Sequence, residues 1–567
     1  MGKIDVKALC LESFFNATDL MGDGACFYQI PDYQRPYCWD KNNVSDLIDD
    51  LFYAYINSKN NEYFCGSVVL VKNTSDDRFD VIDGQQRITT FTILFCVLRD
   101  IYQKRLDKKA NDLISESISD RYDIDKRRLK FLTNDDNQAE FEQKILKGIT
   151  FIDNFRNEQS IPNNIYLQNA HFIKIELEEN IKNNFYNDTS FDVNDFIKWL
   201  FDKVVFTVIK TNDLENAIQV FNVLNDRGLA LRSTDILKSK LMLNLSKEDR
   251  KIFKTTWNSI EKSVDIEDML NSYLYYLICD NPKTSLDKEI LNKYKNEFGT
   301  EKNIDSLKKL VEIKNFSIAY IKACEVEESH NKDIYLLSYL RHKIYWKSIL
   351  STAYFVEYQY TNELISTLVA FYFMHWIAGS TIARLKTTSF KIISSIKNKE
   401  DISVIKKICK ENLDKYDIDK IYKEELRTSD FYNRVWSKPV LIMYEYSIKD
   451  DSVPTYIPLE QKITQEHILP QTPDEKSDWY QLFTDEERVN LTNSIGNMTL
   501  LSLKKNVQAS NDSFSKKKEI YLNKDNVASS FVMTINVLGK DVWNKDEILN
   551  RAKEILTCIE NKLNLFD

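Results

Sequence analysis

The residues best suited to chemistry lie near the carboxyl end of the chain, in the segments TQEHILPQ, SIGNMTLLS and KKNVQASNDSFSKKK. His467 can act as a general base, because an imidazole titrates near neutral pH. Glu466 and the amide oxygen of Asn506 are hard oxygen ligands of the kind that Mg²⁺ or Mn²⁺ prefers. Hydrolysis of a phosphodiester needs a base to activate water and a cation to neutralise charge, so these residues predict a single-metal nuclease site.

Asn497 lies in a Gly-Asn turn, where we expect it to bond backbone groups and to fix the loop that aims the catalytic His467. Asn511 is a rival of Asn506 for the second metal position. A single histidine among five is more often a satisfied core residue, but the ordered set within one short window favours a catalytic site. Five lysines of this window supply positive charge for a DNA backbone: Lys504, Lys505, Lys516, Lys517 and Lys518.

Two Gln-Arg motifs lie near the amino end: IPDYQRPYCW over residues 30–39 and VIDGQQR over residues 81–87. The arginine fork matches phosphate oxygens, Gly84 lets the backbone approach a ligand, and the helix expected after Arg87 points N–H groups at an anion. Asp83 can hold a magnesium ion or position water. The motifs therefore predict a phosphate or nucleotide pocket, although each alone is more often a turn with surface salt bridges.

Two further observations bear on this pocket. The first motif places Gln34 and Arg35 among aromatic and proline residues, which is unusual for a merely solvated charge. A third motif, NDRGL over residues 225–229, offers another arginine and acid on a loop, with Asp235 and Lys238 shortly after it. No Walker sequence GxxxxGK[ST] occurs in the chain.

The composition describes a large folded protein. At 567 residues the chain has room for about three domains, and 43% hydrophobic residues with 11 Gly and 9 Pro indicate a helix-rich fold. The net charge of −9 means that any DNA contact must come from local basic clusters. Nine cysteines without a CxxC pair, and an amino terminus without a secretory signal, predict a reducing, cytoplasmic location.

The apolar stretch Leu364–Ala383 has about the length of a membrane span. We favour a buried core helix by roughly four to one, because a large helical domain needs a helix that is apolar all round. We therefore expect no membrane partner.

The hydrophobic periodicity predicts three regions. Strands are expected in CFYQIPDYQ, FCGSVVLV and RFDVIDGQQ, between about residues 26 and 87, and again at 204–210, with helices over 88–105, 214–224 and 234–245. This pattern indicates an α+β domain at 1–245 that carries a charged helical insertion at about 105–200. Residues 246–445 show only helical periodicity and predict a helical bundle. Residues 446–567 hold the expected nuclease site and end in an amphipathic helix.

The segments EHILPQ, GNMTLLS and N-x₄-N-x₂-F-x-KKK resemble the HNH, or ββα-metal, nuclease domain of GmrSD-type restriction proteins. The resemblance implies that His467 is the general base, that Glu466 and Asn506 hold the metal and that Asn497 organises the loop. Many HNH domains have histidine where this chain has Asn506.

The segments IPDYQRPYCW, VIDGQQRITT and FNVLNDRGLALRSTDILK resemble the ParB/sulfiredoxin-like domain at the front of the same proteins, over residues 10–245. The resemblance implies binding and hydrolysis of a nucleoside triphosphate, with Asp83 and Arg87 catalytic. The nucleotide-binding residues that it implies are Gln34, Arg35, Asp83, Gly84, Gln85, Gln86, Arg87, Asn225 and Arg227.

The expected fold is thus an α+β multidomain protein. It has a ParB/sulfiredoxin-like domain with a helical insertion, a central α-helical bundle and a C-terminal ββα-metal (HNH) domain embedded in helices. The expected function is a cytoplasmic, nucleotide-regulated and metal-dependent DNA endonuclease of Type IV restriction character, directed against modified phage DNA. The alternatives are a ParB-like nucleotide-binding regulator with a silent HNH domain and, more weakly, a toxin that cuts RNA or host DNA. The sequence does not tell which DNA modification is recognised, which nucleotide is bound or whether that nucleotide activates or inhibits cleavage. It also leaves open whether the protein forms a homo-oligomer.

Overall fold

The computed structural model describes residues 4–22, 25–31, 34, 36–73, 77–132, 136–149, 163–185, 191–213, 216–217, 220, 233–242, 245–280, 305–460, 463–522 and 531–566. These residues divide into two compact units, Met1–Leu243 and Asn244–Asp567. The boundary lies close to residue 245, where the sequence predicts the end of the first domain. The regions 246–445 and 446–567 lie in one unit.

The first unit is built on a mixed six-stranded sheet with the strand order β1-β6-β3-β4-β2-β5. β6 is parallel to β3 and antiparallel to β1, β3 and β4 are antiparallel, and β2 is parallel to both β4 and β5. The strands are β1 (Ile4–Cys10), β2 (Tyr28–Ile30), β3 (Tyr63–Asn73), β4 (Arg78–Asp83), β5 (Leu129–Phe131) and β6 (Val204–Thr211).

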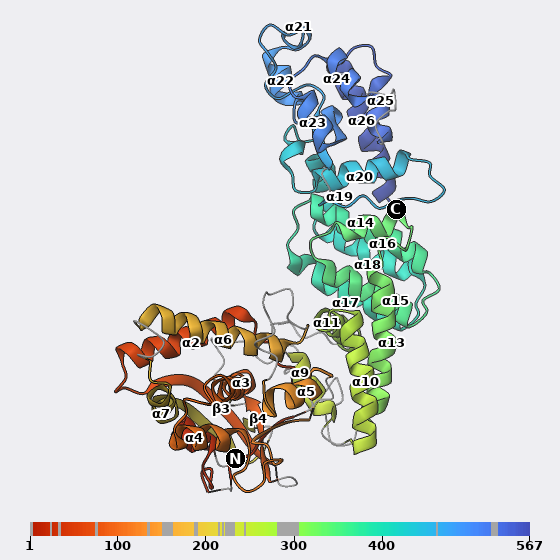
Figure 1. The fold of residues 1–567 in the computed structure, drawn as a ribbon. Helices are drawn as coiled ribbons and strands as arrows, with labels where there is room; N and C mark the ends of the chain where they lie inside the picture. Colours follow the sequence, from red (N-terminus) through yellow and green to blue (C-terminus); the bar gives the residue numbers. More distant parts are fainter. Residues whose placement is uncertain are drawn as a thin grey trace. The chain divides into compact units, whose positions relative to one another are not determined.

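Helices cover one face of this sheet and form the main core with it (Figure 1). Alternate residues of the central strands, such as Val68, Leu70 and Val81, point into that core, whereas Val69 and Ile82 point to the other face. The helical segments of the unit are α1 (Leu11–Phe15), α2 (Lys41–Asn57), α3 (Gln85–Ile101), α4 (Lys108–Ile118), α5 (Asp136–Phe141), the π-helical turn η1 (Glu142–Leu146), α6 (Ile165–Asn184), α7 (Val193–Lys203) and α9 (Ser233–Met242).

The 17-residue helix α2 lies between the first two predicted strand segments, CFYQIPDYQ and FCGSVVLV, where the sequence predicted no element. Its N-terminus is closed by a reciprocal pair: Asp40 accepts the N–H of Asn43 at 3.1 Å, and Asn43 accepts the N–H of Asp40 at 3.2 Å. This capping box satisfies N–H groups that the first helical turn leaves open.

The charged region at 105–200 is an integral part of the first unit. Helices α4, α6 and α7 bury side chains in the same core as the central strands. The short strand β5 extends the sheet by pairing with β2. The region therefore contributes to the hydrophobic core of the first unit.

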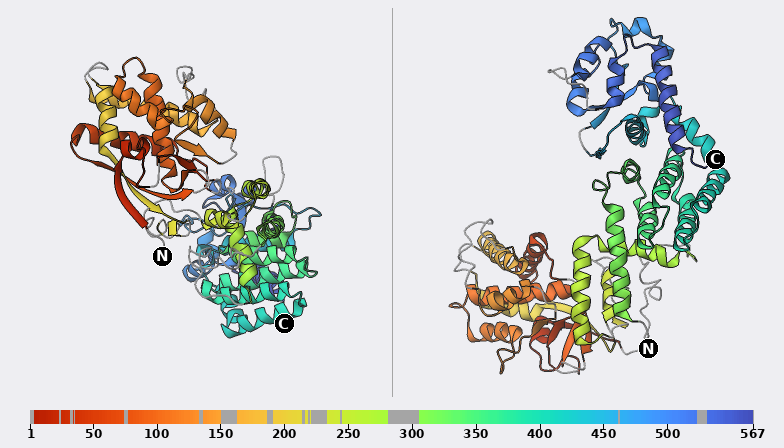
Figure 2. Two further views of the ribbon diagram at one scale, coloured as in Figure 1. Left: turned by 90° about the horizontal axis from the view of Figure 1, so that it is seen from below. Right: turned by 90° about the vertical axis from the view of Figure 1, so that its right-hand side faces the viewer.

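The second unit is mainly helical, and its helices pack against one another in successive layers (Figure 2). The helices that precede its strands are α10 (Lys247–Ser263), α11 (Ile266–Ile278), α13 (Ser306–Cys324), α14 (Lys332–Ser338), α15 (Lys343–Phe355), α16 (Thr361–Ile377), α17 (Ile382–Lys397), α18 (Ile402–Lys415), α19 (Ile418–Leu426), the 3₁₀ turn η4 (Phe431–Asn433) and α20 (Ser437–Ile448).

The apolar stretch Leu364–Ala383 forms a buried helix, as expected, with most side chains of α16 in the interior. The helix stops at Ile377, and Gly379 turns the chain with a left-handed φ of 66°. Among the described residues, none of the helices combines the length and the apolar character that a bilayer crossing requires.

The second unit ends in a two-stranded antiparallel sheet followed by helices. β7 pairs with β8 so that His467 lies opposite Met498 and Glu466 lies opposite Thr499. Helix α23 follows β8 directly and packs on both strands. The segments are β7 (Ile463–His467), α21 (Trp479–Leu482), α22 (Asp485–Leu491), the 3₁₀ turn η5 (Ile495–Asn497), β8 (Met498–Ser502), α23 (Leu503–Ala509), α24 (Phe514–Tyr521), α25 (Val532–Leu538) and α26 (Lys545–Leu563).

Candidate functional site

His467 ends β7 with only 8% of its surface exposed. Its Nε2 lies 2.9 Å from Oδ1 of Asn493, and its ring packs against that of Tyr432 with centroids 4.3 Å apart. An amide oxygen only accepts hydrogen bonds, so the imidazole carries its proton on Nε2. Nδ1 is therefore unprotonated, and it is the atom that can take a proton from water.

Burial lowers the pKa of His467 from 6.5 to about 4, and the nearby Lys517 ammonium acts in the same direction, while the bond to Asn493 opposes them. The ring is therefore neutral near pH 7 and competent to accept a proton. Burial likewise lowers the pKa of His375, in α16, to about 4. Both rings must take up a proton when the protein unfolds in mild acid.

This proton uptake predicts a loss of stability in acid. Between pH 6.5 and 4 the unfolded chain binds more protons than the folded one, so the free energy of unfolding falls as the pH falls through this window. From pH 7 to pH 5 we expect each buried histidine to contribute roughly 2 kcal/mol to that loss. Urea unfolding should show that His467→Gln loses roughly 2 kcal/mol less than the wild type between these pH values. Equal losses would contradict a buried, neutral His467.

Glu466 points away from His467 into the protein. It is 3% exposed, and its Oε1 accepts hydrogen bonds from Nζ of Lys517 at 2.7 Å and from the hydroxyl of Tyr521 at 3.0 Å. Burial raises the pKa of this carboxyl, and the Lys517 ammonium opposes that shift. The carboxylate predicted to bind metal is thus engaged with side chains of α24.

Asn506, in α23, is fastened to β7. Its Nδ2 donates to Oγ1 of Thr464 at 2.7 Å and to the backbone oxygen of Gln465 at 3.0 Å. The rival residue Asn511 is exposed and donates to Oγ1 of Thr472 at 3.0 Å. Asn506 therefore keeps only its Oδ1 for another partner.

The predicted metal residues Glu466, His467 and Asn506 do not converge on one point. Neighbouring side chains of a strand leave opposite faces, and the contacts follow this rule, since Glu466 meets α24 whereas His467 meets Tyr432 and Asn493. Across the residues that the structure describes, no group of three His, Cys, Asp or Glu side chains is placed to hold a metal ion. The predicted ligand set does not fit a single divalent cation in this arrangement.

Asn497 is fully buried and holds the loop between the two strands. Its Oδ1 accepts from the N–H of Leu469 at 2.7 Å and from Nε1 of Trp543 at 3.0 Å. Its Nδ2 donates to the backbone oxygens of Leu469 and Thr492, both at 2.8 Å. All four hydrogen-bonding positions of this amide are used, so it acts on His467 through the backbone.

The preceding Gly496 is packed against α26. A Cβ at this position would lie 2.2 Å from the backbone oxygen of Ile548. Arg551, also in α26, donates from Nη1 to the backbone oxygens of Gly496 at 2.8 Å and Met498 at 2.6 Å. Helix α26 thus fixes the turn that carries Asn497 through hydrogen bonds and close packing.

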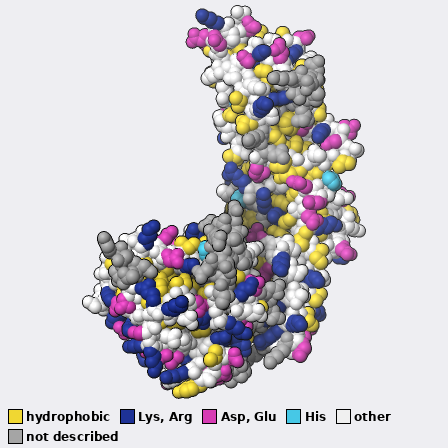
Figure 3. All heavy atoms as spheres, viewed as in Figure 1, with side chains coloured by type: hydrophobic (Ala, Val, Ile, Leu, Met, Phe, Trp, Pro, Cys, Tyr) yellow, Lys and Arg dark blue, Asp and Glu magenta, His cyan; other side chains and the backbone are white. Residues whose placement is uncertain are grey.

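The five lysines predicted to contact DNA divide by exposure. Lys504 and Lys516 are exposed, and Lys516 pairs with a carboxylate on the next turn of its helix. Lys505 and Lys518 are half-buried and donate to backbone oxygens at 2.7 and 2.6 Å. Lys517 is fully buried, so its ammonium cannot reach a phosphate in this structure. On the face shown in Figure 3, basic and acidic side chains are interspersed.

In the first unit, the sequence DGQQR forms a turn from a strand into a helix. β4 ends at Asp83, Gly84 adopts a left-handed φ of 90°, and α3 begins at Gln85, three residues before the predicted start. A Cβ on Gly84 would lie 2.8 Å from Cγ2 of Val68, so glycine suits both the turn and the close packing. The first turn of α3 directs its N–H groups toward this loop.

The two Gln-Arg motifs lie side by side because Gln86 joins them. Its Oε1 accepts from the backbone N–H groups of Cys38 at 2.8 Å and Trp39 at 3.2 Å. Gln34, from the first motif, donates from Nε2 to the backbone oxygen of Ile82 at 3.0 Å. Both glutamines are buried, and their side-chain amides form hydrogen bonds with backbone groups. They therefore have a structural role in this region.

Arg87 lies along β3. Its Nη2 donates to the backbone oxygen of Ser67 at 2.6 Å and lies 3.7 Å from Oδ2 of Asp83. Gly66 makes room for the guanidinium, because a Cβ there would lie 2.3 Å from Nη1. The buried Nε of Arg87 has no hydrogen-bond partner. The side chains of Asp83 and Arg87 are both partly exposed, so a ligand can reach them.

Three predicted nucleotide-binding residues, Arg35, Asn225 and Arg227, lie outside the described residues. Gly84 and Gln85 are the two predicted residues that remain. Gln85 is buried in the first turn of α3, and Gly84 forms the turn before it. The structure thus brings the first and second motifs together around residues 82–87.

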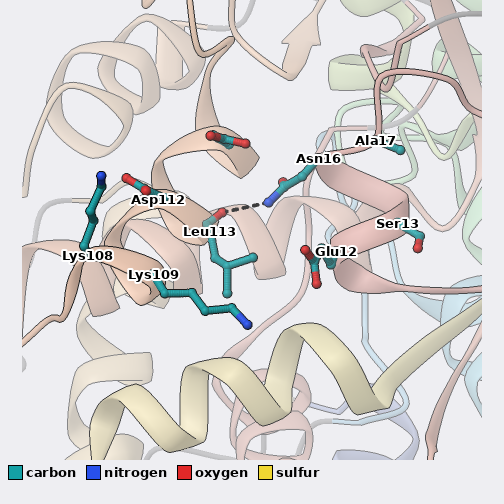
Figure 4. Close-up of a pocket in the computed structure, with 9 residues that line it drawn as sticks. Glu12, Ser13, Asn16, Ala17, Lys108, Lys109, Asp112 and Leu113 are labelled. Carbon is teal, nitrogen blue, oxygen red and sulfur yellow. Dashed lines mark hydrogen bonds between the residues drawn. The ribbon is translucent and has the colours of Figure 1, made fainter.

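A surface pocket of about 640 Å³ lies between α1 and α4 (Figure 4). Its lining mixes acidic and basic side chains, among them Glu12, Lys109 and Asp112. Asn16 donates from Nδ2 to the backbone oxygen of Leu113 at 3.1 Å at one side of it. Of the predicted nucleotide residues that the structure describes, none lines this pocket, so it is separate from the DGQQR turn.

Sequence reasoning missed three residues that shape these sites. Asn493, which holds the ring of His467, lies four positions before Asn497 in LTNSIGN and carries no motif of its own. Tyr521 was missed because its partner Glu466 is distant in the chain. Gly66 had a readable signal, since an isolated glycine in an apolar strand often marks a bulge or a close approach.

Comparison with known families gives a consistent result for both units. Residues 11–242 match the family described as GmrSD restriction endonuclease, N-terminal domain, and residues 416–558 match GmrSD restriction endonucleases, C-terminal domain. Together the two matches take in more than half of the chain, and both candidate sites lie within them. No curated protein matches the chain. The chain therefore belongs to the GmrSD restriction endonuclease family.

Proposed function

We propose that this protein is a nucleotide-regulated DNA endonuclease of HNH type that cuts modified phage DNA in the cytoplasm. The GmrSD family implies a Type IV restriction endonuclease, which acts on DNA. In this proposal, the second unit of the protein supplies the nuclease centre, and the first unit binds and hydrolyses a nucleoside triphosphate. The observation that supports the nuclease assignment best is the buried, neutral His467, which Asn493 holds at the end of β7.

In the proposed reaction, Nδ1 of His467 takes a proton from the water that attacks phosphorus, which breaks the bond to the leaving oxygen. The Nε2–H group stays bonded to Asn493 and fixes the plane of the ring. Asn497 keeps the loop behind the ring in place through the backbone of residues 468 and 469. A divalent ion, Mg²⁺ or Mn²⁺, is expected for a restriction endonuclease, but Glu466 and Asn506 do not meet around one ion in this structure.

For DNA contact, the proposal relies on the exposed Lys504 and Lys516, with Lys505 and Lys518 as additional positive charge near the site.

The alternative of a nucleotide-binding regulator with a silent nuclease domain gains support from one observation. The carboxylate of Glu466 is engaged with Lys517 instead of lying open to a metal. Absence of nicking by the wild type with Mg²⁺, Mn²⁺ and each nucleoside triphosphate would favour that alternative.

The proposed nucleotide site lies at the DGQQR turn, where Asp83 and Arg87 are partly exposed beside the first turn of α3. The buried Nε of Arg87 lacks a partner, and Gly66 leaves just enough room for the guanidinium. An arginine held at a helix N-terminus suits the phosphates of a nucleotide. The position of Arg87 should therefore control nucleotide-dependent cutting.

A pair of glycine variants tests this assignment. Gly66→Ala places a Cβ 2.3 Å from Nη1 of Arg87, whereas Gly22→Ala meets no atom within 4 Å, and both positions have a left-handed φ of 96° and 86°. We expect Gly66→Ala to lower the rate of nucleoside triphosphate hydrolysis and nucleotide-dependent cutting by about tenfold or more, and Gly22→Ala to change both far less. Hydrolysis of ATP, GTP, CTP and UTP and cleavage of modified and plain phage DNA are the measurements. Equal effects of the two variants would contradict a role for Arg87.

A further inference from the structure

A fully buried charged cluster joins β7 to α24. Nζ of Lys517 donates to Oε1 of Glu466 at 2.7 Å and to the backbone oxygen of His467 at 2.6 Å. The hydroxyl of Tyr521 donates to the same Oε1 at 3.0 Å. The Lys517 side chain is 0% exposed and that of Glu466 is 3% exposed, so neither charge has contact with bulk water.

We propose that Glu466 is the buried counter-ion of Lys517 and a positioning residue for the backbone of His467, and that it is not a ligand of a divalent cation. The ammonium of Lys517 already occupies the cation position beside the carboxylate. A divalent ion at Oε1 would displace it and leave the buried ammonium of Lys517 without its carboxylate counter-ion, which is strongly unfavourable. The inference uses the proposed function only in naming His467 as the base.

The geometry of α24 and β7 explains why the cluster reaches His467. Lys517 and Tyr521 are four residues apart and therefore lie on one face of α24, from which both reach Glu466. Strand alternation turns Glu466 toward α24 and the imidazole of His467 toward Asn493. Because Lys517 also binds the backbone oxygen of His467, α24 fixes the residue that carries the base without touching its ring.

A double-mutant cycle on the full-length protein tests this inference. The variants are Glu466→Gln, Lys517→Met and the two combined, with Lys516→Met as the exposed control on the same helix. The readouts are the midpoint of thermal unfolding and the affinity for Mn²⁺ measured by titration calorimetry. Neither readout uses DNA cleavage, so a failure of the proposed nuclease function does not affect the result.

We expect each single change to lower the unfolding midpoint by about 5 °C or more, because each leaves one buried charge without its partner. The double variant should recover at least about half of the summed loss, and Lys516→Met should shift the midpoint by less than about 1 °C. The double variant should bind Mn²⁺ within about twofold of the wild type.

Two outcomes would overturn the inference: additive midpoint losses, or Mn²⁺ binding by a folded double variant that is weaker by about tenfold or more. If the wild type binds no Mn²⁺, the unfolding midpoints of the double-mutant cycle alone test the inference. If a single variant does not fold, Tyr521→Phe removes only one hydrogen bond to Glu466, and it should lower the midpoint slightly and leave Mn²⁺ binding unchanged. A tenfold loss of Mn²⁺ binding in Tyr521→Phe would count against the inference.

Discussion

Replacing His467 by alanine is expected to lower the rate of DNA cleavage by about 10²–10⁴-fold, the usual contribution of a general base. The ring is neutral near pH 7, and its Nδ1 is free to accept a proton because Nε2–H is bonded to Asn493. Alanine cannot accept a proton, and no other histidine of the second unit contacts Asn493 or Tyr432 among the described residues. The measurement is single-turnover cleavage of phage DNA with saturating protein.

His342→Ala is the matched control, because His342 is an exposed histidine of the same unit and makes no side-chain cap for its helix. It should cleave at the wild-type rate. Thermal unfolding of both variants shows whether they are folded at the assay temperature. Cleavage by folded His467→Ala at more than about a tenth of the wild-type rate would rule out the assigned base.

Substitution of Gly496 by alanine is expected to destabilise the second unit by about 3 kcal/mol. The added Cβ would lie 2.2 Å from the backbone oxygen of Ile548 and 2.9 Å from Cβ of Ala552, and the hydrogen-bonded backbone of α26 cannot move aside cheaply. Displacing α26 would also disturb the hydrogen bonds from Arg551 to this turn. Urea unfolding measures the change in the free energy of unfolding.

Gly539→Ala provides the control for this prediction. Gly539 follows α25 with a right-handed φ of −73°, and a Cβ there would have its nearest contact at 3.7 Å, an ordinary van der Waals distance. We expect a change within about 0.5 kcal/mol. Equal stabilities of the Gly496 and Gly539 variants would show that the turn and α26 are not packed as described.

Local patterns predicted much of the fold correctly. β6 spans Val204–Thr211 where the sequence predicts a strand at 204–210, because its β-branched residues are buried on both faces. The buried helix α16 was also predicted, although its end at Ile377 depends on the turn at Gly379. The Gly-Asn turn before β8 was expected from its residue types.

The site was harder to predict because its decisive contacts are distant in the chain. Lys517 lies within a run of three lysines that looks uniformly solvated, and only the structure shows that its side chain is buried and bonded to β7. Its pairing with Glu466 removes from the predicted metal set a residue whose type alone suited Mg²⁺. Asn493 was missed for the same reason, since its bond to His467 depends on how the loop folds.

Chemical rescue tests the central claim, that His467 is the base of a DNA endonuclease, most directly. The measurement is the rate of phage DNA cleavage by His467→Gly at pH 7 with increasing concentrations of imidazole, in the presence of Mg²⁺ or Mn²⁺ and a nucleoside triphosphate. We predict almost no cleavage without imidazole and a rate that rises with the concentration of its neutral form, because the small molecule can enter the space left by the ring. Wild-type cleavage by this variant without imidazole, or no rescue of a folded variant by any concentration of it, would contradict the claim.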